Sequence, residues 1–168
     1  MTEVYSEKAL EKASKIYETD EGVKKSFEAS NALKAEGKGQ WTRIQEVLSY
    51  IKHMGYEKVG LAYCAGLKGE ADTLTEIFAG NGVELSRIGC SVGGKGCNPV
   101  GQAMTLNEIG ADFNIAMGLC MGHDILFQQF SDAPVTVLAI KDRVAFHNPV
   151  APLYNTSWRR KLSEKALG

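Results

Sequence analysis

Four cysteines are the residues of this chain best suited to chemistry, and they are Cys64, Cys90, Cys97 and Cys120. A cysteine thiolate is both a nucleophile and a ligand for soft metal ions. No two of the cysteines form a Cys-x-x-Cys pair, so the spacing lacks the pattern of a zinc finger or a ferredoxin. What these thiols can do therefore depends on where the fold places them.

The elements that must position the cysteines alternate between short apolar runs and helical patterns. We expect strands at residues 59–63, 83–88, 113–117 and 135–140, with helices between them at residues 71–78, 99–109 and 123–130. This alternation predicts an α/β fold of the Rossmann-like or flavodoxin-like kind, with three layers and a four-stranded parallel sheet. The predicted strand order is 2-1-3-4.

The cysteines follow the carboxyl ends of these predicted strands. Cys64 and Cys90 come directly after the first and second strands, and Cys120 lies shortly after the third. Cys97 precedes Asn98, a good N-cap residue for the next helix, and a helix N-terminus favours the thiolate. Since neighbouring strands lie about 4.8 Å apart, the thiols should converge at one edge. We predict a four-cysteine metal site that holds zinc or an iron–sulfur cluster.

Two further hypotheses remain open at this edge. His123 and Asp124 follow Cys120, and they could serve a thiol-dependent or metal-dependent enzyme as ligand, acid or base, or simply cap a helix. In such an enzyme three cysteines would hold the metal, or Cys97 would be the nucleophile. In the remaining hypothesis, a small molecule binds in the crevice at the switch point of the sheet.

Helical patterns precede the sheet around residues 4–17, 23–33 and 41–51, and Gly55 ends the last of them. We expect a single α/β domain over residues 1–168, made of a helical extension at 1–55, a core with the cysteine site at 56–150 and a tail at 151–168. The first two helices carry few large apolar residues, so they should pack on the main body or on a second subunit. A homodimer is therefore one expectation.

The composition limits the classes of partner. The chain has 168 residues, a formal net charge of -1 and no basic stripe, so nucleic acid is not an expected partner. We interpret the basic run Trp158–Lys161 as a solvated tail. No stretch is apolar enough to cross a membrane, and the polar N-terminus does not resemble a signal peptide. We therefore expect a cytoplasmic protein whose thiols stay reduced.

Several runs of the chain form recognisable motifs. They are Trp41–Arg43, Gly60–Leu67, Cys97–Ala103, Leu106–Glu108, Asn114–Ile115, Gly118–Asp124, Ala133–Leu138, Lys141–Arg143 and His147–Pro149. Together they resemble DUF1847, a family of uncharacterised bacterial and archaeal proteins usually described as metal-binding, over about Trp41 to Tyr154. The resemblance implies a metal held by the four cysteines with His123 close by, and it brings no established reaction.

The chain departs from the family pattern in two places. Family members carry an additional cysteine-rich segment before the helical region, and we do not find that segment here. They also have a longer segment where this chain has only Ser91–Gly96. The resemblance therefore implies a reduced version of the metal site.

Overall fold

The computed structural model describes residues 4–94 and 96–164. The chain divides into two compact units, residues 1–55 and residues 56–168, and each is described by itself. The first unit holds the helices that precede the sheet, and the second holds the sheet with the cysteines. That the two units belong to one domain stays a prediction.

Three helices make up the described part of the first unit: α1 (Glu7–Thr19), α2 (Glu21–Gly37) and α3 (Arg43–Met54). Each begins at a residue whose side chain accepts a hydrogen bond from the first turn, namely Ser6, Asp20 and Thr42. Gly55 ends α3 in the left-handed conformation, as the sequence predicts. α1 buries none of its residues, whereas α3 buries Val47, Leu48 and Ile51.

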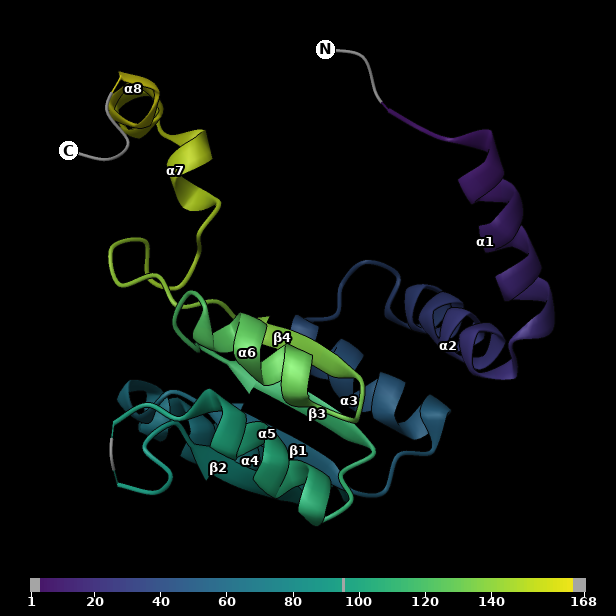
Figure 1. The fold of residues 1–168 in the computed structure, drawn as a ribbon, viewed down its shortest axis with the longest axis horizontal. Coiled ribbons are helices and arrows are strands. Elements are labelled where there is room, and N and C mark those ends of the chain that lie inside the picture. Colours follow the sequence, from purple (N-terminus) through teal and green to yellow (C-terminus); the bar gives the residue numbers. More distant parts are fainter. Residues whose placement is uncertain (1–3, 95, 165–168) are drawn as a thin grey trace. The chain divides into compact units, whose positions relative to one another are not determined.

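The second unit is built on a four-stranded sheet (Figure 1). Its strands are β1 (Val59–Tyr63), β2 (Leu85–Gly89), β3 (Phe113–Met117) and β4 (Val135–Ala139). All pairings are parallel and the order is β2-β1-β3-β4, which confirms the predicted Rossmann-like sheet. β2 begins two residues later than predicted because the backbone N–H of Val83 donates to the carbonyl of Phe78, which keeps Val83 in the turn after the preceding helix.

Helices α4 (Lys68–Gly80), α5 (Pro99–Glu108) and α6 (His123–Phe130) connect the strands, with a short 3₁₀ turn at Ala65–Leu67 before α4. α5 and α6 lie together over one face of the sheet (Figure 1). The core beneath them consists of Ala62, Ala103, Leu106, Ala116, Leu119 and Phe127. Small residues on β1 and β3 let the two helices approach closely, and burial of this cluster fixes the sheet edge that carries the cysteines.

The C-terminal segment is helical where the sequence analysis expected only a tail. It contains α7 (Ala151–Tyr154) and α8 (Thr156–Glu164), and neither buries a residue. Asn155 begins α8, because its side chain accepts the backbone N–H of Trp158 at 3.0 Å. The sequence signal was weak because α7 has four residues and α8 nine, too few for an apolar period to be recognised. None of the helices among the described residues has the length and apolar character needed to cross a membrane.

Candidate cysteine site

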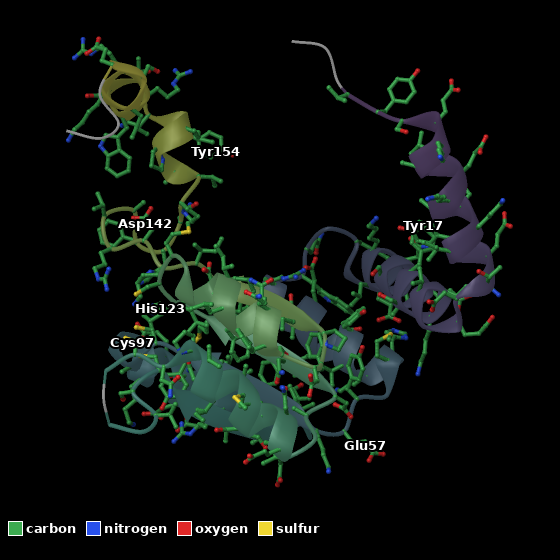
Figure 2. The ribbon with its side chains drawn as sticks, in the orientation of Figure 1. Tyr17, Glu57, Cys97, His123, Asp142 and Tyr154 are labelled. Atoms are coloured by element: carbon green, nitrogen blue, oxygen red, sulfur yellow. The ribbon has the colours of Figure 1, made fainter. Side chains whose placement is uncertain are left out.

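The ends of β1 and β2 place two cysteines side by side. Tyr63 pairs with Gly89 in the parallel register, so Cys64 and Cys90 are the next residues along the two neighbouring chains. Cys97 and His123 lie at this carboxyl end of the sheet, whereas Glu57, just before β1, lies at the opposite end (Figure 2). The sheet topology therefore brings the predicted residues to one edge.

Cys90 and Cys97 face each other across a short loop. Their Sγ atoms are 3.8 Å apart, and the backbone N–H of Asn98 donates to the carbonyl of Cys90 at 2.7 Å, which closes the loop at its base. Gly93 and Gly94 turn the chain with φ angles of 84° and 75°, values that residues with a side chain rarely adopt. Cys90 is buried and Cys97 is exposed. One thiol of the pair is thus open to solvent and the other is enclosed.

Cys64 extends this pair to a row of three thiols. The Cys90 thiol hydrogen-bonds the Cys64 sulfur, and the backbone N–H of Ala65 donates to the Cys90 sulfur at 3.3 Å. Lys141, from the segment after β4, also hydrogen-bonds Cys64. The row Cys64–Cys90–Cys97 therefore runs from a cation to the exposed surface.

The surroundings of Cys64 and Cys90 shift their acidities in opposite directions. Partial burial of Cys64 opposes its ionisation, but hydrogen bonds from the Gly66 backbone and from Lys141 outweigh this and lower the pKa of the Cys64 thiol. Burial raises the pKa of the Cys90 thiol, and the neighbouring Cys97 and Cys64 add to the rise. As pH rises, Cys64 is thus ionised before Cys90, and the Cys90 thiol can donate to the Cys64 thiolate.

Cys120 lies at the same edge but has a different neighbour. Its Sγ accepts a hydrogen bond from the guanidinium of Arg143 at 3.7 Å. Gly118 turns the chain out of β3 with a φ of 64°, and a Cβ on it would overlap the Leu67 side chain. Within residues 4–94 and 96–164, no set of three or more His, Cys, Asp or Glu side chains is arranged to hold a metal ion. The structure brings Cys64, Cys90 and Cys97 together and leaves Cys120 beside a cation.

The structure places His123 and Asp124 in the first turn of α6. The carboxylate of Asp124 accepts the backbone N–H of Ile125 at 2.8 Å, so it serves its own helix. Gly122 is the N-cap residue, and the backbone N–H of His123 donates to the carbonyl of Cys120 at 2.9 Å. A role of this pair as acid and base stays a prediction.

Two cations at this edge were not singled out by the sequence analysis. Lys141 and Arg143 flank Asp142, whose carboxylate accepts the backbone N–H groups of Val144 and Ala145 at 3.0 and 2.8 Å. The backbone N–H of Asp142 donates to Nδ1 of His147 at 3.1 Å. These bonds form a tight turn after β4 that presents one cation to Cys64 and the other to Cys120. The signal in the sequence was the run Lys-Asp-Arg directly after the last strand.

Gln102 was also missed, and it ties the strand ends together. Its side chain is fully buried, and its amide donates to the carbonyls of Tyr63 at 3.2 Å and Ile88 at 2.8 Å. Tyr63 immediately precedes Cys64, and Ile88 lies two residues before Cys90. The amide oxygen of Gln102 is buried without a partner in the described structure. Gln102 therefore helps to set the separation of the two chains that carry these thiols.

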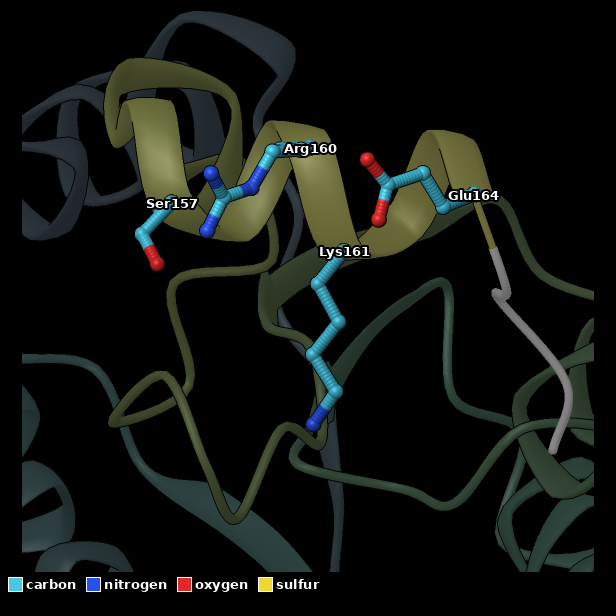
Figure 3. Close-up of a pocket in the computed structure, with 4 residues that line it drawn as sticks. All are labelled: Ser157, Arg160, Lys161 and Glu164. Atoms are coloured by element: carbon cyan, nitrogen blue, oxygen red, sulfur yellow. The ribbon is translucent and has the colours of Figure 1, made fainter.

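A surface hollow lies elsewhere, on α8. Ser157, Arg160, Lys161 and Glu164 line it, and they follow one face of that helix (Figure 3). All four lining residues are polar or charged, and none is an apolar or aromatic residue of the kind that usually lines small-molecule sites. A small-molecule site at the switch point of the sheet stays a prediction.

The fold and the thiols define a class of protein, namely a Rossmann-like α/β protein with cysteines along the carboxyl edge of its sheet. The family model "Protein of unknown function (DUF1847)" matches residues 1–96 and 94–138, and the chain belongs to this family. It is also similar to "Uncharacterized protein MJ0455" of Methanocaldococcus jannaschii, with 40% identity over 165 residues, which cover 88% of this chain and 84% of that protein. The predicted resemblance is confirmed, and neither description names a metal.

Proposed function

We propose that the protein binds a thiophilic metal, as a zinc ion or an iron–sulfur cluster, through Cys64, Cys90 and Cys97, with Cys120 as the fourth ligand. The separation of 3.8 Å between the Cys90 and Cys97 sulfurs supports this proposal most directly. Two sulfurs on one tetrahedral zinc ion, each bonded at about 2.3 Å, lie about 3.8 Å apart. The pair thus already has the spacing that shared coordination requires.

The charges around the thiols also suit a metal. Bound thiolates carry more negative charge than a divalent ion neutralises, and Lys141 and Arg143 lie beside Cys64 and Cys120 to offset the excess. Cys64 has the lowered pKa that favours the ligand form. Zinc would hold the edge loops together, whereas a cluster would supply one-electron transfer. Since no group of three or more ligands is preformed among the described residues, binding must bring Cys64 and Cys120 to the Cys90–Cys97 pair.

Metal content tests this proposal directly. The full chain is purified without oxygen, and zinc, iron and acid-labile sulfide are measured together with the absorption spectrum. We expect near-stoichiometric zinc without colour, or iron with sulfide and brown absorbance. Cys90→Ser and Cys97→Ser should each lower the metal content, whereas Ser91→Ala, an exposed neighbour on the same loop, should leave it unchanged. Metal-free wild-type protein, or four cysteine variants that all retain the wild-type content, would refute the proposal.

A second candidate is a thiol-dependent enzyme whose nucleophile is Cys64. The observation that favours it is the pair of donors on the Cys64 sulfur, from Lys141 and the Gly66 backbone, because both stabilise a thiolate. This nucleophile differs from the one that the sequence analysis considered, which was Cys97. Competition labelling with a limiting amount of iodoacetamide at neutral pH tests it. Modification of Cys64 ahead of exposed Cys97 would support this function, and preferential modification of Cys97 would oppose it.

A second copy of the chain is the partner that we propose for α1. Leu10 and Tyr17 lie seven residues apart on α1, so they share one face, and both are more than half exposed. The Tyr17 ring packs edge-on against the Phe27 ring, with 5.3 Å between the ring centroids. This contact extends the apolar surface onto α2. Sedimentation equilibrium should give a dimer that Leu10→Lys disrupts. A monomer at every concentration would oppose this pairing.

A further inference from the structure

We propose that Cys90 and Cys97 form a reversible intramolecular disulfide, and that this pair reacts with low-molecular-weight disulfides. The proposal goes beyond metal binding, because it concerns the same two thiols when no metal holds them. Disulfides in reducing compartments are usually transient and serve catalysis or redox sensing.

The geometry favours closure of this pair. The two sulfurs lie 3.8 Å apart, whereas the sulfurs of a disulfide lie about 2.0 Å apart. Closure therefore requires the sulfurs to approach by about 1.8 Å. The hydrogen bond from Asn98 N–H to the Cys90 carbonyl, at 2.7 Å, holds the two backbone segments together. A rotation of the exposed Cys97 side chain can supply the approach. The intervening glycines Gly93 and Gly94 already form the turn that closure requires.

Exposure decides which thiol reacts first. A disulfide reagent in solution reaches the exposed Cys97 more easily than the buried Cys90, and Cys64 is half-buried. Cys97 therefore forms the first mixed disulfide, and its sulfur then lies next to that of Cys90. Cys120 is not the partner of Cys97, because the sulfur that lies next to Cys97 is that of Cys90, and Cys120 contacts Arg143 instead.

The reaction balances in two exchange steps. The Cys97 thiolate attacks one sulfur of the reagent, forms a mixed disulfide and releases the other half as a thiolate. The Cys90 sulfur then attacks Cys97 Sγ, forms the internal disulfide and releases the second half. The proton of the Cys90 thiol passes through solvent to the released thiolate. In sum the two protein thiols are oxidised, and the reagent is reduced to two thiols.

The test uses metal-free full-length protein and oxidised glutathione. After incubation, free thiols are blocked with N-ethylmaleimide and the protein is cleaved after glutamate. The peptide Leu85–Glu108 contains Cys90 and Cys97 and no other cysteine. We expect it to be unblocked and lighter by two hydrogen atoms. Trypsin should then remove Leu85–Arg87 and cut after Lys95, leaving Ile88–Lys95 and Gly96–Glu108 joined by the disulfide. Dithiothreitol should restore both thiols.

Variants assign the steps. Cys90→Ser should accumulate glutathione on Cys97, Cys97→Ser should lose the internal disulfide, and Ser91→Ala, an exposed position on the same loop, should behave as the wild type. A disulfide between any other two cysteines, or full blocking of Cys90 and Cys97 while the same glutathione oxidises free dithiothreitol, would overturn the proposal. Thermal unfolding of each variant verifies that it is folded. The metal content of the wild type is measured in parallel, so that failure of metal binding and failure of disulfide formation are distinguished.

Discussion

Lys141 hydrogen-bonds the sulfur of Cys64 although the two residues follow strands that are not neighbours. Cys64 comes directly after β1, and Lys141 comes two residues after β4, with β3 between these strands. The long side chain passes the end of β3 at Gly118, where an added Cβ would lie 4.0 Å from Lys141 Cε. This contact joins three strand ends at the candidate site and leads to the first two predictions.

Replacement of Lys141 should make Cys64 less acidic. Lys141→Met removes the hydrogen bond and the positive charge that favour the thiolate, so the pKa of Cys64 should rise. The pH dependence of iodoacetamide modification of Cys64, followed by mass spectrometry, should shift to higher pH. Lys141→Arg should keep most of the wild-type profile, and Lys68→Met, which removes an exposed ammonium paired with Asp72, should not change it. An unshifted profile in Lys141→Met would show that the contact does not govern Cys64.

The same contact should make stability depend on pH. Because folding lowers the pKa of Cys64, its ionisation stabilises the folded protein above the ordinary cysteine pKa, and this contribution is lost as pH falls through the folded pKa. The difference in unfolding free energy between wild type and Lys141→Met should therefore grow as pH rises through that window. Urea unfolding of reduced, metal-free protein at several pH values measures it. If this difference became smaller with rising pH, the conclusion that folding lowers the pKa of Cys64 would be wrong.

The buried amide of Gln102 should contribute to stability and to the order of the thiol row. Gln102→Met has a similar size but leaves the carbonyls of Tyr63 and Ile88 without their buried donor. We expect a loss of about 1–3 kcal/mol of unfolding free energy. Cys90 should also become easier to alkylate, since the two strand ends are no longer tied. Gln128→Met is the matched control, because exposed Gln128 bonds only within α6, to Asp124 O.

Gly118 should tolerate no side chain. Gly118→Ala forces a residue with a Cβ into a φ of 64° and against Leu67, so we expect a loss of about 1–3 kcal/mol from the backbone conformation alone, with the overlap adding to it. Leu67→Ala in the same chain should relieve the overlap but not the backbone strain. A double-mutant cycle of the two substitutions therefore separates the cost of the overlap from the cost of the strain. Gly69→Ala, in open space on α4, should instead stabilise the protein slightly. Equal stability of Gly118→Ala and wild type would refute this account.

Local patterns predicted most of the sheet unit. The predicted bounds of β3 and α6 agree with the structure, and the Asn98–Pro99 start of α5 is confirmed. The start of β2 was wrong because Val83 bonds back to the helix before it. The C-terminal helices were missed because α7 has four residues and α8 nine, so neither fills the window over which an apolar period can be recognised.

The sequence by itself determined the order of strands and helices and, through the parallel topology, the edge at which the cysteines gather. These features follow from apolar periodicity and right-handed crossovers, which are local and general rules. Only the tertiary structure decided which sulfurs meet: Cys64, Cys90 and Cys97 form one row, and Cys120 lies beside Arg143. It also showed that Lys141 lies at Cys64 and that Gln102 bonds to the ends of β1 and β2. Separations of a few ångströms depend on loop conformation and side-chain rotamers, and no pattern along the chain encodes those.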